Sequence, residues 1–143
     1  MGVLDRETLR DGLAAGSIAA VVSGAPSAAH ALLSSRNPLE ASLTAETLLL
    51  LPRERQPGRL LLAAAPVHIA LSLAWALLLA VVLPRRRTAA WAAMAGLGIA
   101  ALDLGLVGRR FPRIRALPQL PQVADHLTYG AAVGAVLTAR RRR

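Results

Sequence analysis

The chain contains no cysteine and no lysine, and only 3% of its 143 residues are aromatic. Without cysteine there are no disulfides, no thiolate metal ligands and no dithiol redox chemistry. Without lysine, no side-chain amine can form a Schiff base. There is also no G-x-S-x-G motif and no phosphate-binding glycine loop followed by Lys and Ser or Thr. The sequence therefore predicts no enzyme, no catalytic residue and no cofactor.

Positive charge is carried by arginine alone, with a formal net charge of +9 and a pI near 11.8. Such a balance is common in nucleic-acid-binding proteins, but here the arginines cluster at the edges of apolar segments and lack interleaved stacking aromatics. We therefore expect the partner to be a lipid bilayer and no nucleic acid. The absence of lysine beside abundant Ala, Arg, Leu and Gly is typical of a GC-rich genome, which favours a bacterial inner membrane.

Hydrophobic residues make up 55% of the chain, and its mean hydropathy is +0.47. A membrane-spanning helix needs about 20 mostly apolar residues. Four segments meet or approach this length, at about 12–33, 60–83, 88–108 and 121–138. The predicted fold is all-α: a single domain over residues 1–143, built as a transmembrane bundle of four helices.

The predicted four-helix arrangement has two further features: a short helix in the first loop and a proline inside two of the spans. Asn37-Pro38-Leu39-Glu40 has the residues of a helix start, and the segment that runs from it to Leu51 is too short to span a membrane. We expect it to form a short interfacial helix. Pro26 and Pro66 lie inside spans, where each removes a backbone hydrogen bond and tends to kink the helix.

Small residues recur at four-residue spacing in three of the spans: Gly12, Gly16 and Ala20; Ala92, Gly96 and Ala100; Gly130 and Gly134. In lipid such residues let helix backbones approach closely. We expect tight contacts among the first, third and fourth spans, with much of the leucine-rich second span facing lipid or a partner. A homodimer or a complex with another membrane protein is the expected assembly.

Orientation is weakly encoded. Four crossings place nine arginines on the side of the termini and eight on the other, which gives almost no positive-inside bias. We favour cytoplasmic termini because the densest arginine clusters lie on that side. The alternative is a dual-topology protein that inserts both ways.

The predicted topology brings the ionisable residues of the spans into one layer, in the half of the membrane next to the first and third loops. This candidate polar layer consists of His30, His68, Asp103, Asp125, His126 and Tyr129. Charged groups in hydrocarbon cost about 2.5–3.5 kcal/mol on insertion scales, so they normally face the bundle interior or water.

Three interpretations of the layer stay open. It is a polar network that fixes helix register, a site for protons or a solute, or a site for metal or haem. No HExxH or paired Glu-x-x-His motif is present. The leading function is a non-enzymatic membrane component that assembles through small-residue faces; the alternatives are a small proton-linked carrier and a haem- or metal-binding protein. A carrier requires the layer to face a cavity, whereas a scaffold buries it in mutual hydrogen bonds.

The first helix, GLAAGSIAAVVSGAP, and the last, His126-Leu-Thr-Tyr129-Gly130 followed by AAVGAVL, resemble the small YagU-type bacterial inner-membrane proteins. The resemblance covers about 30 of the 143 residues, roughly the length of the two motifs. It implies a multi-pass membrane protein and assigns no catalytic residue.

Overall fold

The computed structural model describes residues 5–41, 43, 44 and 56–142. It is all-α and 84% helical, and the described residues contain no strand. The elements are α1 (Arg6–Val22), α2 (Ala25–Leu33), α4 (Pro57–Val82), α5 (Thr88–Ala100), the π-helix η1 (Ala101–Val107), the 3-10 turn η2 (Gly108–Arg110), α6 (Pro112–Ala116) and α7 (Gln119–Arg140). The predicted all-α class is confirmed.

Three of the helical stretches are long and apolar enough to cross a membrane: Arg6–Leu33, Gly58–Val82 and Thr88–Arg110. They coincide with the first three predicted spans, and they indicate a multi-pass membrane protein. The fourth predicted segment forms α7, a helix of 22 residues that carries more polar side chains than α4 or α5. Its length corresponds to about 33 Å at 1.5 Å per residue.

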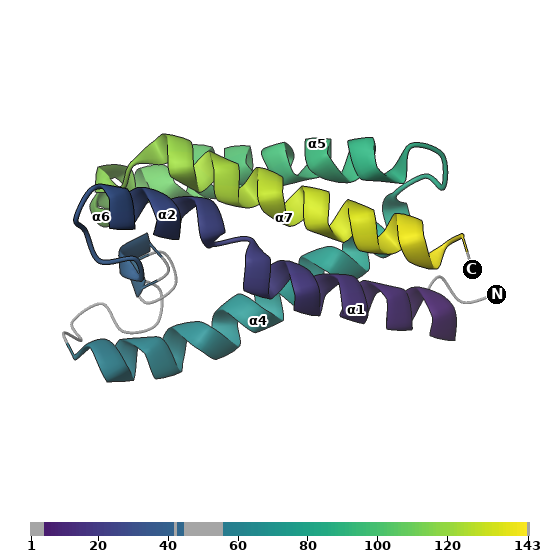
Figure 1. The fold of residues 1–143 in the computed structure, drawn as a ribbon, viewed down its shortest axis with the longest axis horizontal. Coiled ribbons are helices and arrows are strands. Elements are labelled where there is room, and N and C mark those ends of the chain that lie inside the picture. The colour runs from purple at the N-terminus through teal and green to yellow at the C-terminus, as the bar shows by residue number, and fades with distance from the viewer. Residues whose placement is uncertain (1–4, 42, 45–55, 143) are drawn as a thin grey trace.

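The long helices alternate in direction (Figure 1). The end of the bundle that holds both chain termini and the connection from α4 to α5 is called here the termini end. The opposite end, with α2, α6 and the first turns of α4 and α7, is called the loop end. α7 packs against α5, α1 and α2, and α1 packs against α4, whereas α4 and α7 touch at few points. α7 is therefore the central helix.

The first span is broken after Val22, where α1 stops and α2 begins at Ala25. Pro26 lies four residues after Val22, so it has no N–H for the Val22 carbonyl, and its ring would clash with that carbonyl in a continuous helix. The predicted disturbance at Pro26 is thus a complete helix break. α4, by contrast, continues through Pro66.

α5 and α7 meet along a glycine seam. A Cβ atom added to Gly96 would collide with the carbonyl oxygen of His126, and one added to Gly130 with that of Ala92. At Gly134 an added Cβ would lie 2.8 Å from the Cα of Ala89. These are the small-residue faces predicted for the third and fourth spans, and both are used within the chain.

The small-residue face of α1 packs differently from our expectation. Added Cβ atoms at Gly12 and Gly16 would lie 2.8 Å from the Leu77 side chain and 3.0 Å from the Leu73 backbone, so this face contacts α4. The leucines of α4 are long enough to fill the notch that the glycines leave. The expected contact between the first and fourth spans is present, because α1 and α2 pack against α7, but the glycine face of α1 meets α4 instead of the third span.

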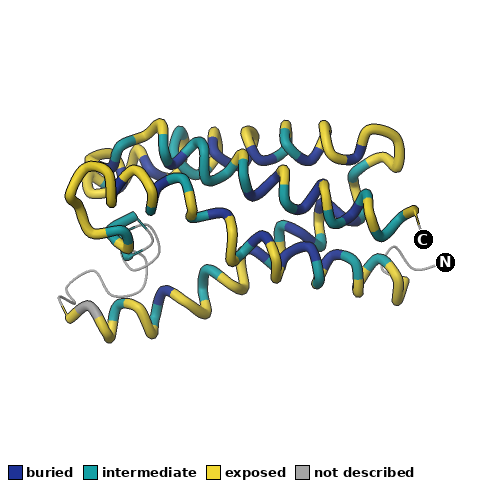
Figure 2. Tube along the Cα trace, viewed as in Figure 1, coloured by how far each residue is buried: buried dark blue, intermediate teal, exposed yellow. Residues whose placement is uncertain are grey.

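The buried core is small and lies mainly toward the termini end, as Figure 2 shows. Among the described residues, only Leu137 and Val133 are large side chains with essentially no exposed surface, and most other core residues are alanines. Large apolar side chains face outward instead, including Leu62 at 79% exposure and Val21 at 83%. A bundle that exposes this much apolar surface is suited to a lipid environment.

Two arginines of the C-terminal cluster link the end of α7 to α1 and α4 at the termini end. Arg140 Nη1 lies 3.2 Å from Asp11 Oδ1, which joins α7 to α1. The Arg141 guanidinium donates to the Ala80 carbonyl at 2.7 Å and the Leu83 carbonyl at 3.2 Å, at the end of α4. Burial and the nearby Arg85 charge lower the pKa of Arg141 from its ordinary value.

The predicted interfacial helix, residues 37–51, lies largely outside the described residues. Within the described part, the Asn37 Oδ1 accepts the Leu39 N–H at 2.9 Å, as a helix cap does, and residues 40, 41, 43 and 44 are helical. Glu40 pairs with Arg36 at 2.9 Å, and the hydrogen bond to Glu40, together with its charge, raises the pKa of that guanidinium.

Candidate functional site

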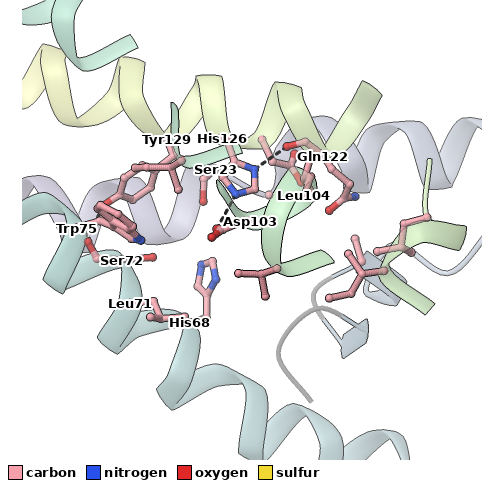
Figure 3. A pocket seen from close by; sticks show the side chains of 17 residues that line it. Ser23, His68, Leu71, Ser72, Trp75, Asp103, Leu104, Gln122, His126 and Tyr129 are labelled. Carbon is pink, nitrogen blue, oxygen red and sulfur yellow. Dashed lines mark hydrogen bonds and ion pairs between the residues drawn. The ribbon is translucent and has the colours of Figure 1, made fainter. Parts of the chain in front are cut away.

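A cavity of about 250 Å³ lies toward the loop end, between α4 on one side and η1 and α7 on the other. Figure 3 shows side chains from these elements converging on it. Five of the six residues of the predicted polar layer line it: His68, Asp103, Asp125, His126 and Tyr129. The structure thus brings five of the six residues together at one cavity.

Asp103 and His126 are hydrogen-bonded to each other at the cavity wall. His126 Nε2 lies 3.1 Å from Asp103 Oδ2, and Asp103 keeps 45% of its side chain exposed. Asp103 belongs to η1, where its carbonyl accepts the N–H of Gly108, five residues on. π-Helical turns are frequent at functional sites because they displace a side chain from the regular helical register. Here the turn carries the acidic member of the pair.

The hydrogen-bond geometry of His126 fixes where a proton must lie. His126 Nδ1 is 2.8 Å from the Gln122 carbonyl oxygen, which can only accept, so Nδ1 carries hydrogen. The contact from Nε2 to Asp103 then also needs a hydrogen, either on the ring or on the carboxyl group. Asp103 and His126 together therefore hold one exchangeable proton between them.

Asp125 joins α7 to the broken first span. Its Oδ1 accepts the Ser27 N–H at 2.9 Å. Ser27 lies in the first turn of α2, where backbone N–H groups have no partner within the helix and attract negative charge. The helix break at Pro26 thus creates the donor that orients Asp125.

Two further hydrogen bonds hold α4 against the bundle. His68 Nε2 donates to the Ala20 carbonyl at 2.9 Å, and Tyr129 donates its hydroxyl to the Ser72 carbonyl at 2.5 Å. The Ala20 carbonyl lies at the end of α1, where the helix break leaves it without the N–H of a fourth following residue. His68 and Tyr129 therefore position α4 at the edges of the cavity.

His30 is not brought into the cavity. It is exposed on α2 and lines a separate hollow of about 20 Å³ with Arg36, Asn37 and Glu40. The break in the first span explains this outcome, because α2 does not continue the helical register of α1. His30 therefore does not belong with the other five residues of the predicted polar layer.

Within the described residues, no arginine of the 109–115 segment is paired with either aspartate; Asp103 is hydrogen-bonded to His126, and Asp125 to a backbone amide. The same part of the chain contains no group of three or more His, Asp or Glu side chains placed to hold a metal ion. The cavity is thus a site whose polar groups are two carboxylates, two imidazoles and their hydrogen-bond partners.

Sequence reasoning missed several residues of the site. Gln122 supplies the carbonyl that orients His126, and Trp75 forms part of the cavity wall (Figure 3). Helical spacing was the available signal, because Gln122 precedes His126 by four residues and Trp75 follows His68 by seven. The break and the π-helix have no comparable pattern. The complete set of lining residues is Ser23, Gly24, Ala41, His68, Leu71, Ser72, Trp75, Ile99, Asp103, Leu104, Val107, Ile114, Leu117, Gln122, Asp125, His126 and Tyr129.

No protein-family model, no curated protein and no solved structure matches this chain.

Proposed function

We propose that this chain is a multi-pass protein of the bacterial inner membrane with four crossings and cytoplasmic termini, and that it is a small proton-linked carrier. The alternating directions of the helices and the 22-residue length of α7 support the fourth crossing. Both termini then lie on one side, next to the arginines of the C-terminal cluster.

The observation that carries the proposal is that the intramembrane Asp and His side chains line a cavity. A scaffold would bury these groups in mutual hydrogen bonds, yet Asp103 keeps 45% of its side chain exposed. The proton shared by Asp103 and His126 supplies the proton linkage, because a solute that approaches Asp103 changes how tightly that proton is held. The cavity supplies the solute site.

Assembly through small-residue faces has less support. Gly12, Gly16, Gly96, Gly130 and Gly134 are all in contact with other helices of the same chain. The faces left for a partner are rich in leucine and valine, which lipid satisfies equally well. This favours a carrier over a component that acts only by association.

The natural absence of cysteine makes the proposal directly testable. In membrane vesicles, Leu104→Cys places a single thiol in the cavity wall, and Met94→Cys places one on the outer face of α5, where the native side chain is 60% exposed. We expect a membrane-impermeant cationic methanethiosulfonate to label Leu104→Cys from either side of the membrane and Met94→Cys from neither. A C-terminal tag that protease removes from one side only establishes that the protein has a single orientation.

Labelling of Leu104→Cys from one side only would overturn carriage, because a carrier exposes its site alternately to both sides. Labelling from neither side would overturn the solute site as well and return the polar groups to a structural role.

A further inference from the structure

The cavity differs in charge from the rest of the molecule. The chain has 17 arginines and eight acidic residues. Two of the eight, Asp103 and Asp125, line the cavity, and none of the described lining residues is an arginine. A chain with a net charge of +9 therefore has a cavity whose ionisable side chains are carboxylates and imidazoles.

Both carboxylates have an oxygen that the protein leaves open. Within the described residues, Asp103 uses Oδ2 for His126, and Asp125 uses Oδ1 for the Ser27 amide. No buried side-chain oxygen or nitrogen in this part of the chain lacks a partner. The second oxygens, Asp103 Oδ1 and Asp125 Oδ2, are therefore not fully buried. Each can accept a hydrogen bond or stabilise a positive charge.

Most of the rest of the wall is apolar or aromatic, and its other polar side chains are Ser23, Ser72 and Gln122. Leucine, isoleucine and valine side chains from α4, α5, η1 and α6 surround the polar groups, and Trp75 contributes an indole ring (Figure 3). The face of an indole ring attracts cations, with a strength of about 0.5–2 kcal/mol. A volume of about 250 Å³ is just below the roughly 300–1,000 Å³ of pockets for drug-sized ligands, which suits a smaller molecule.

We propose that the cavity binds a small organic monocation with an apolar body, such as an amine or quaternary ammonium carrying a hydrocarbon or aromatic group. The inference rests on the proposed function and names the class of its solute. Asp125 supplies the charge partner, because its hydrogen bond is to a neutral amide, whereas Asp103 already has His126. The apolar wall and Trp75 hold the body of the ligand.

The test uses the full chain in lipid nanodiscs with Trp91→Phe, so that Trp75 is the only tryptophan and its fluorescence reports on the cavity. The probe is benzyltrimethylammonium. Neopentylbenzene has the same shape with carbon in place of nitrogen, and benzenesulfonate has a similar ring with the opposite charge. Empty nanodiscs correct for partition into lipid. We expect saturable binding of the cation at least tenfold tighter than that of either control compound.

Asp125→Asn removes the charge but keeps an oxygen for the Ser27 amide, so its fold is expected to persist. We expect it to weaken cation binding about tenfold or more and to leave neopentylbenzene unchanged. Asp11→Asn is the matched control, because Asp11 is paired with Arg140 outside the cavity. It should bind the cation as the parent protein does.

Equal binding of cation and neutral isostere, or an Asp125→Asn variant that binds the cation unchanged, would overturn the cation inference while leaving a solute site in place. Tighter binding of benzenesulfonate would overturn it as well. Failure of the proposed function is recognised separately, by the lack of two-sided labelling at Leu104→Cys.

Discussion

The termini end of this bundle is closely packed, whereas the loop end, built from the same long helices, holds a cavity. Toward the termini end, α7 meets α5 backbone against backbone at glycines and meets α1 at alanines, and the interior is filled. Toward the loop end, α4 stands away from α7, and the space between them is a cavity lined by carboxylates and imidazoles. In this bundle, continuous helices with small residues pack closely, whereas the cavity lies beside a proline break and a π-helical turn.

The largest effect is expected from disturbing the glycine seam. Gly130→Ala places a Cβ against the Ala92 carbonyl, and neither backbone can yield without parting the helices. Overpacking of this kind costs about 1–3 kcal/mol, and contact with backbone favours the upper end of that range. The measurement is unfolding of the purified protein in mixed detergent micelles.

The matched control for this substitution is Gly98→Ala on α5, where an added Cβ meets nothing within 4 Å. It should leave stability unchanged or raise it by up to about 1 kcal/mol, because alanine is the better helix former. If both variants unfold alike, the two helices are not in backbone contact.

A smaller effect is expected at the fastening of the termini end. Arg141→Ala removes hydrogen bonds to the Ala80 and Leu83 carbonyls and to Thr88 Oγ1, and so separates α7 from the turn between α4 and α5. Because the guanidinium is partly exposed, we expect a loss of about 1 kcal/mol in the free energy of unfolding. Arg142→Ala, at the exposed neighbouring position, should cause no measurable loss. Equal losses would indicate a general charge effect instead.

The smallest effect is expected where the closed and open regions meet. Tyr129→Phe removes the hydrogen bond to the Ser72 carbonyl but keeps the buried ring. Such bonds between membrane helices are worth about 0.6 kcal/mol on average. The variant should unfold slightly earlier, and its Trp75 fluorescence should change because α4 is less firmly held beside the cavity. Unchanged fluorescence would show that Tyr129 does not position α4.

Much of this fold is readable from the sequence because hydropathy fixes which residues enter the membrane. The bounds of α4 and of the helical stretch Thr88–Arg110 were predicted within a few residues. Depth along the helices grouped Asp103, Asp125 and His126, which the structure brings to one cavity. Rotation of α4 about its axis could not be predicted, because α4 is apolar on all sides. That is why the pairing of α1 with α4 was not foreseen.

The candidate site also depends on contacts that could not be predicted from the sequence. Pro26 signalled a disturbance, but only the structure shows that the break turns His30 out of the layer and presents the Ser27 amide to Asp125. Arg141 was interpreted as one more interfacial charge, although it caps the carbonyls at the end of α4. Such contacts join residues far apart in the chain, and no local pattern encodes them.

The most direct test of the central claim compares water access at the two ends of the bundle. Leu71 and Leu78 lie two turns apart on the same face of α4 and are 51% and 48% exposed, but only Leu71 lines the cavity. Hydroxyl-radical footprinting in lipid nanodiscs measures how often water-borne radicals reach each side chain. We predict that Leu71 is oxidised several-fold faster than Leu78, which faces lipid. Equal and low oxidation of the two leucines would contradict the account, because the carboxylates and imidazoles would then lie in a closed, dry interior.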